Sequence, residues 1–174
     1  LPMIRPGPHP LPAPRRPDHW ERARIVTVAE AHPDGQWQEL SPLAPQVTAQ
    51  KGEGLVPPIW AAFEPGAVVE FRFRGTVLGL IGLKGPDNGQ FRVTVDDLPP
   101  ETGTLFDNYS TPGRYYLKPW FFSRTLPDRE HRVRLELLPA KIDKAAILKK
   151  AGVTMTDPKP YAAHGLYLGG FLIV

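Results

Sequence analysis

The chain has 174 residues, of which 41% are hydrophobic and 22% charged, and its formal net charge is +3. These values fit one soluble globular domain, and the small, evenly spread charge argues against nucleic acid as a partner. The absence of cysteine excludes disulfides, thiolate nucleophiles and zinc–thiolate sites. No apolar run approaches the roughly 20 residues that a membrane helix needs, so no membrane segment is expected.

The N-terminal segment differs in composition from the rest. Residues 1–19 hold proline at seven positions, which opposes a helix or a central strand. We interpret this segment as an extended arm or linker and residues 20–174 as one folded domain. Because the chain begins at Leu1 rather than at Met, we expect it to be a processed or excised piece.

The chain from residue 20 to residue 83 should begin the sheet structure. A first strand is expected over 23–29, and residues 41–66 are rich in proline, which predicts an irregular loop over one end of the core. Apolar and charged residues then alternate over 69–74, which predicts a half-buried strand, and 76–83 is a second, nearly all-apolar strand. The apolar residues of the long loop are Leu55, Val56, Ile59, Trp60 and Phe63.

The remainder continues the pattern. A turn at 85–89 leads into an alternating strand over 91–95, and with the two preceding strands this suggests a three-stranded meander. Another alternating strand covers 131–138, residues 141–151 form the one good helix candidate, and 166–174 should be the closing strand. The fold class is therefore all-β, an antiparallel β-sandwich or jelly roll with one short helix. Its expected core residues are Val69, Phe71, Phe73, Val93, Val95, Val133, Leu135 and Leu137.

A search for catalytic motifs finds none that is complete. The three serines, Ser41, Ser110 and Ser123, match neither the Gly-x-Ser-x-Gly elbow nor Ser-x-x-Lys, and none lies in a Gly-Asp-Ser block. No two of the five histidines stand two to four residues apart, which argues against a local metal motif. We expect no cofactor other than a structural calcium ion held by turn carboxylates. The carboxylates weighed for calcium or for an acid/base pair are Asp96, Asp97, Asp107 and Asp128, and capping of turns is the stronger interpretation.

The unusual feature is an aromatic run over 105–122, LFDNYSTPGRYYLKPWFF. Flat aromatic faces beside hydrogen-bonding side chains suit sugar rings, so this run is the candidate ligand site, although a jelly roll also buries aromatics in its core. We expect Phe106, Phe121 and Phe122 in the core. The candidate ligand-binding residues are Asn108, Tyr109, Arg114, Tyr115, Tyr116 and Trp120, with Trp37 and Trp60 as the next aromatic candidates.

Four blocks of the sequence together carry a resemblance to a known family. They are PGAVVEFRFRGTVLGL, GPDNGQFRVTVDD, LFDNYSTPGRYY and REHRVRLELL. This pattern resembles the β-sandwich domain that precedes the catalytic domain in some bacterial SGNH (GDSL-type) hydrolases, which are carbohydrate esterases. The tail over 144–174 resembles the segment that ends that module, so the likeness covers residues 20–174.

The resemblance implies an extracellular or periplasmic, non-catalytic module that binds a polysaccharide or oligosaccharide beside an SGNH hydrolase domain. The family's catalytic serine, aspartate and histidine lie in that other domain, and no residue here corresponds to them. Two alternatives stay open. One is a small jelly-roll lyase that abstracts a proton with Tyr and Arg or His, and the other is a structural interaction domain that binds no glycan.

Overall fold

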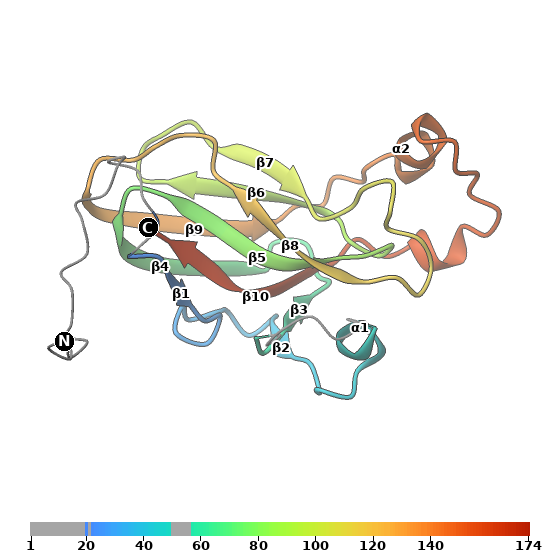
Figure 1. Cartoon of the computed structure of the whole chain (residues 1–174), viewed down its shortest axis with the longest axis horizontal. Coiled ribbons are helices and arrows are strands. Elements are labelled where there is room, and N and C mark those ends of the chain that lie inside the picture. The colour runs from blue at the N-terminus through green and yellow to red at the C-terminus, as the bar shows by residue number, and fades with distance from the viewer. Residues whose placement is uncertain (1–19, 21, 50–56) are drawn as a thin grey trace, which may run out of the picture.

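The computed structural model describes residue 20, residues 22–49 and residues 57–174; the expected arm over 1–19 lies outside them, as do Leu55 and Val56. Two antiparallel sheets pack face to face (Figure 1). One sheet has the order β2-β3-β10-β5-β8, with β1 also pairing with β10, and the other has the order β4-β9-β6-β7. The expected all-β sandwich is therefore confirmed. No helix in the described part of the chain is long and apolar enough to cross a membrane.

The elements are short, as the many prolines and glycines predict. The strands are β1 (Arg24–Val26), β2 (Gln38–Glu39), β3 (Trp60–Ala62), β4 (Val68–Gly75), β5 (Leu78–Lys84), β6 (Gln90–Val95), β7 (Glu101–Thr104), β8 (Tyr116–Phe121), β9 (Arg129–Leu137) and β10 (Leu166–Ile173). The helices are α1 (Pro45–Thr48), α2 (Lys144–Lys150) and the 3-10 helix η1 (Lys159–Tyr161).

The core lies between the sheets and is built from alternate residues of each strand. All eight residues expected in the core are buried, with exposed fractions from 0% to 7%. On β4 and β9 the intervening positions carry charged residues that face outward, so the period-2 pattern places each side chain on the correct face. Phe71 also packs on Phe171 of β10, which joins the two sheets across the core.

The expected meander is wrong, because β4, β5 and β6 do not pair with one another. β4 and β6 both pair with β9 in the four-stranded sheet, whereas β5 lies in the other sheet between β10 and β8. The turn at 85–89 likewise crosses between sheets instead of closing a hairpin. β5 is buried on both faces except at Ile81 and Lys84, because Phe121 covers Gly79 and Leu83 packs with Ile59 and Tyr167.

Three boundaries differ from expectation for local reasons. The first strand is shorter than 23–29 because the Glu30 carboxylate accepts hydrogen bonds from the backbone N–H and the hydroxyl of Thr27, which turns the chain. α2 begins later than 141, since Asp143 caps the amide of Ala146 at 2.8 Å. The loop expected over 41–66 contains β3 instead, which pairs with β10 and places Ile59, Ala61 and Ala62 in the interior.

Candidate functional site

The first part of the aromatic run, residues 105–115, lies at the end of the sandwich that also carries α2, away from the C-terminus (Figure 1). Residues 105–115 connect β7 to β8 there, and the 85–89 connection and the 138–165 segment lie beside them. We call this region the loop end. Loops on a rigid sandwich are free to carry binding groups because their side chains need not fill the core.

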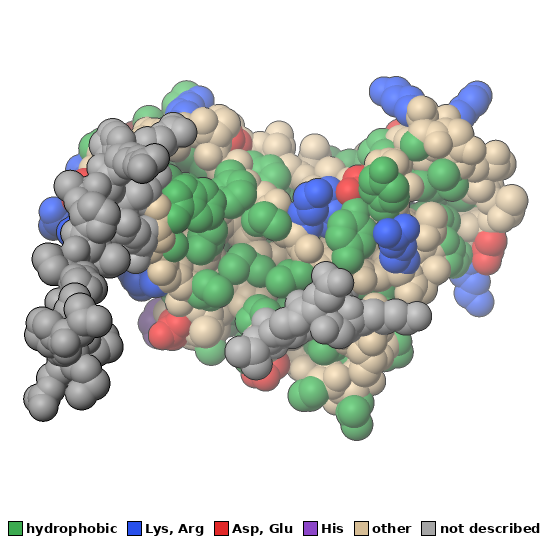
Figure 2. Space-filling model, in the orientation of Figure 1, with side chains coloured by type: hydrophobic (Ala, Val, Ile, Leu, Met, Phe, Trp, Pro, Cys, Tyr) green, Lys and Arg blue, Asp and Glu red, His purple; other side chains and the backbone are tan. Residues whose placement is uncertain are grey.

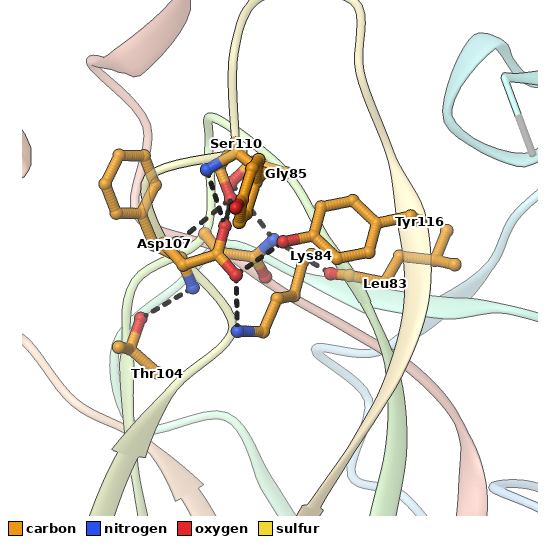
Figure 3. Close-up of polar contacts among 10 residues, drawn as sticks. Leu83, Lys84, Gly85, Thr104, Asp107, Ser110 and Tyr116 are labelled. Carbon is orange, nitrogen blue, oxygen red and sulfur yellow. Dashed lines mark hydrogen bonds and ion pairs between the residues drawn. The ribbon is translucent and has the colours of Figure 1, made fainter. Parts of the chain in front are cut away.

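The carboxylate of Asp107 anchors the β7–β8 connection (Figure 3). Its Oδ2 atom accepts hydrogen bonds from Lys84 Nζ at 2.7 Å and from the Tyr116 hydroxyl at 2.5 Å. Its Oδ1 atom accepts from the backbone N–H of Tyr109 at 2.9 Å and from the Ser110 hydroxyl at 3.3 Å. Every donor therefore addresses one ionised group, which fixes the start of the loop and the first residue of β8.

Burial and hydrogen bonding act against each other at this anchor. Burial raises the pKa of Asp107, but the bonds from Lys84, Tyr116 and the Tyr109 amide outweigh it and hold that pKa below its ordinary value. Burial and the neighbouring Asp107 charge raise the pKa of Tyr116. The carboxylate is therefore ionised and the phenol neutral at pH 7, so the pair holds the loop and does not form a general acid or base poised near neutrality.

The anchored loop presents an exposed aromatic ring beside a guanidinium group. Tyr109 is 56% exposed. The Arg114 guanidinium lies over the Tyr109 ring at 5.5 Å and over the Tyr116 ring at 5.7 Å from the respective centroids. Gly113 has a φ of 74°, a left-handed conformation that favours glycine and turns the chain so that Arg114 returns over the rings. We call Tyr109, Arg114 and Tyr116 the tyrosine platform.

The six candidate ligand-binding residues do not all lie in one place. Tyr109, Arg114 and Tyr116 come together in the platform, and Asn108 precedes Tyr109 in the same loop. Tyr115 turns to the other side, where its hydroxyl donates to Asp87 Oδ2 at 3.0 Å and its ring packs edge-on against Tyr167. Trp120 is partly buried and packs edge-on against Phe91 beside the core.

The burial of the remaining aromatic residues agrees with expectation at some positions and differs at others. Phe106 and Phe122 are buried as expected, but Phe121 is 38% exposed and lies edge-on against Trp20. Trp37 is buried and Trp60 packs against the core, so neither offers a free aromatic face. Alternation along β8 explains the reversal, because residues 120 and 121 must face opposite sides of the sheet and Trp120 is the one facing inward.

A buried polar cluster supports the loop end from beneath. Asp87 Oδ2 accepts hydrogen bonds from the hydroxyls of Tyr115 and Tyr167. Lys144, only 4% exposed, donates to the carbonyl oxygens of Pro86 at 2.9 Å, Tyr161 at 2.9 Å and Ala163 at 2.5 Å. Burial lowers the pKa of Lys144 to about 8, against the raising effect of Asp87. Three donors thus meet three carbonyls, tying α2 and η1 to the 85–89 turn.

The sequence search missed Lys84 and Lys144 as site residues. Lys84 ends an apolar strand, and Lys144 lies among the lysines of KIDKAAILKK, where every lysine matches an exposed helix face. Asp107 gives a local signal, because an aspartate three residues before Ser110 matches an Asx-type turn, and the Tyr109 amide bonds its side chain.

The serines and histidines form no hydrolytic arrangement in the described residues. Ser110 Oγ contacts Asp107, Ser123 Oγ donates to Glu101 at 2.6 Å, and Ser41 Oγ accepts from the amide of Leu43. His131 does contact a carboxylate, Asp96 at 2.8 Å, but its other ring nitrogen lies 2.8 Å from the carbonyl oxygen of Pro127. That imidazole is 1% exposed, so it has no free nitrogen to offer a nucleophile.

Of the four carboxylates weighed for calcium, Asp96 and the adjoining Asp97 line one hollow, whereas Asp107 and Asp128 lie elsewhere. Asp107 lies with Lys84, Asp96 with Arg129 and His131, and Asp128 with Arg74. Within the described residues, no three His, Cys, Asp or Glu side chains lie close enough to share a metal ion. Asp96 accepts from the amide of Arg132, which is the capping role favoured from the sequence.

The two sheets differ sharply on their outer faces. The outer face of the six-stranded sheet carries apolar side chains that gather over β1, β5, β8 and β10 (Figure 2), among them Ile25 at 51% and Leu117 at 39% exposure. The outer face of the four-stranded sheet carries ion pairs, such as Glu70 with Arg132 and Arg134. We call the first surface the apolar outer face.

Comparisons with known proteins show a shared fold. No family model and no curated protein matches the sequence. A two-domain esterase active on acetylated mannans, crystallised with mannopentaose, superposes with a TM-score of 0.59 at 13% identity over 95% of this chain. A second structure of a two-domain esterase active on acetylated mannans gives 0.56 at 12% identity over 98% of this chain. The chain spans only 39% and 40% of those two proteins.

A third structure is matched over most of its own length. The CBM36-1 domain of a xylanase from the hindgut metagenome of Trinervitermes trinervoides is matched over 94% of its chain and 86% of this one, at 12% identity and a TM-score of 0.45. That score is too low to carry an argument. The fold is what these likenesses establish, and the chemistry has to come from the residues.

Proposed function

We propose that this domain is a non-catalytic, carbohydrate-binding module that binds a polysaccharide or oligosaccharide at the tyrosine platform. We further propose that it serves a secreted carbohydrate esterase of the SGNH type, outside the cytoplasm. The observation that carries the proposal is the exposed Tyr109 ring held beside Arg114 on a loop that Asp107 anchors. The shared fold with two-domain esterases supports the context without supplying a ligand.

The platform suits a sugar for physical reasons. An aromatic ring can pack on the apolar C–H face of a pyranose, while the guanidinium and the Asn108 amide offer donors and an acceptor to its hydroxyls. Tyrosine has few rotatable bonds, so little side-chain entropy is lost on binding. One exposed ring predicts weak binding, with a dissociation constant of about 1 mM, or about 4 kcal/mol.

The test of the platform is affinity electrophoresis and calorimetry against a panel of neutral plant and algal polysaccharides. Tyr109→Ala and Arg114→Gln should each weaken binding at least about tenfold, which corresponds to about 1.4 kcal/mol. Phe63→Ala is the matched control, because Phe63 is a 44% exposed aromatic residue that packs against Tyr167 and lies outside the platform. Unchanged binding in both platform variants, or no glycan bound by the wild type, would overturn the proposal.

The non-catalytic part has its own test. The chain should release no acetate from acetylated mannan or nitrophenyl acetate above the buffer rate, because none of its serines contacts a histidine in the described residues. Turnover that disappears in Ser41→Ala, Ser110→Ala or Ser123→Ala would contradict it. The SGNH context is tested by the reading frame after Val174, where we expect a Gly-Asp-Ser block.

A second candidate function is favoured by the apolar outer face. Contiguous exposed apolar residues on a soluble domain mark an interaction surface more often than chance. The occupant would be the neighbouring hydrolase domain, and the module would then position that domain with or without a glycan. Absence of glycan binding, combined with protection of β8 amides from hydrogen exchange in the longer polypeptide, would favour this role over the first.

A further inference from the structure

A second hollow, of about 400 Å³, lies at the opposite end of the sandwich from the tyrosine platform. It opens between β1 of one sheet and the end of β4 of the other. Backbone around Gly75 and Val174 forms part of its wall, and Arg22, Arg24, Arg74 and Asp128 supply its charged side chains. We call it the arginine hollow.

Positive charge prevails among the described side chains of this hollow. Arg74 Nε pairs with Asp128 at 3.2 Å. Among the described residues, no carboxylate lies within ion-pair distance of Arg22 or Arg24. Glu30 senses the Arg24 charge, but its carboxylate is bound by Thr27. Three guanidinium groups thus share one hollow with the Asp128 side chain and the terminal carboxylate of Val174.

Several arginines of the four-stranded sheet are instead paired with carboxylates. On the neighbouring sheet face, Arg72 pairs with Glu130 and both Arg132 and Arg134 pair with Glu70. Like charges held close together repel one another, so an arginine cluster without matching carboxylates costs free energy unless an anion enters. The hollow therefore offers an anion two guanidinium groups, those of Arg22 and Arg24, that no described carboxylate pairs.

We propose that the arginine hollow binds the carboxylate of an acidic saccharide, of the uronic acid type. The planar guanidinium donates two parallel hydrogen bonds to a carboxylate, and arginine keeps its charge at all working pH values. A volume of about 400 Å³ admits a saccharide unit as well as its carboxylate. The proposal rests on the proposed carbohydrate function, and it adds a preference for acidic over neutral glycans through a second, separate site.

The experiment titrates the whole chain with a galacturonic acid trisaccharide, followed by calorimetry or NMR, at low and at physiological salt. A neutral trisaccharide and inorganic sulfate are titrated alongside. Arg22→Gln and Arg24→Gln should each weaken uronate binding at least about fivefold, and added salt should weaken wild-type binding. Both residues are exposed, and a thermal melt confirms that the variants fold.

Arg92→Gln is the charge-matched control, because Arg92 is an exposed arginine on β6 that does not line the hollow. Tyr109→Ala should leave uronate binding intact, so failure of the platform and failure of the hollow can be told apart. The inference is overturned if the wild type binds no uronate, if Arg92→Gln weakens binding as much as Arg24→Gln, or if sulfate binds as tightly as the trisaccharide.

Discussion

At the residue scale, two charged side chains hold the loop end in place, and each is satisfied in a different way. Lys144 is buried with all three of its N–H groups on carbonyl oxygens. Asp107 sits nearer the surface and collects donors from two strands and its own loop. Neither side chain is placed to transfer a proton to a ligand, because the Lys144 N–H groups and the Asp107 oxygens are all engaged in hydrogen bonds within the protein. We expect both side chains to contribute to the free energy of unfolding.

Lys144→Met keeps most of the side-chain volume but removes the three donors. Because the carbonyls of Pro86, Tyr161 and Ala163 would lose a charged partner, we expect the free energy of unfolding to fall by about 2–4 kcal/mol. Lys149→Met, on the exposed side of the same helix, should change it by less than about 0.5 kcal/mol. Urea denaturation measures both, and equal effects would contradict the account.

Asp107 should give a pH-dependent contribution. Its pKa is depressed in the folded protein, so its stabilising effect is complete above the unfolded value near 3.9 and is lost as the pH falls through the folded value. Asp107→Asn should therefore lower the free energy of unfolding by about 1–3 kcal/mol at pH 6. That difference from wild type should shrink below about pH 4. A difference that is constant from pH 6 to pH 3 would show that the charge is not responsible.

At the element scale, strand faces could be predicted from the sequence and strand partners could not. Alternation at Val69, Phe71 and Phe73 identifies which side chains point inward whatever the neighbouring strand is. Which strands pair depends on close approaches between backbone segments, and these cannot be recognised from single residues in the sequence. A Cβ atom at Gly75 would overlap the backbone of Val174, so this glycine allows β4 to end against β10 and lets the chain cross to the other sheet.

For the candidate site, the position of the loop could be predicted from the sequence, but the residues that contact it could not. The aromatic run identified the correct loop, because loops with turn glycines and exposed aromatics are recognisable in a sequence. The partners were missed because Lys84 and Asp107 are 23 residues apart, and only the sheet topology brings them together. The inward orientation of Trp120 could not be predicted, because every residue of β8 except Lys118 is apolar or aromatic and the phase of the alternation is then undecided.

Gly82 offers a test of the packing of β5. A Cβ atom there would overlap the Leu105 side chain and lie 2.5 Å from the carbonyl oxygen of Tyr167, and that carbonyl is backbone. Gly82→Ala should therefore cost about 1–3 kcal/mol of unfolding free energy. Gly35→Ala, with nothing within 4 Å, should be neutral or slightly stabilising. Thermal or urea unfolding distinguishes them, and a neutral Gly82→Ala would refute the described packing.

At the scale of the whole molecule, the two outer faces and the two ends carry different types of side chain. The four-stranded sheet presents ion pairs to solvent, and the six-stranded sheet presents the apolar outer face. The tyrosine platform and the arginine hollow lie at opposite ends. Under the proposed function the ends contact a glycan, and the apolar outer face, which adjoins them at Leu117 and Ile25, contacts a neighbouring domain.

The apolar outer face can be tested without knowing its partner. Phe121→Ser should reduce the fluorescence of a hydrophobic dye bound to the folded protein, since an exposed aromatic of this face is removed. Leu43→Ser is the control, because Leu43 is 83% exposed but lies near α1. An equal reduction by both variants would indicate scattered dye binding instead of a surface.

The central claim is that the loop end binds a glycan, and amide chemical-shift mapping with neutral oligosaccharides tests it most directly. We predict saturable shifts confined to residues 105–116 and their neighbours at 84–89, with the Tyr109 and Arg114 amides among the largest. Shifts confined to β1, β5 and β8, or no shifts at millimolar oligosaccharide, would contradict the claim.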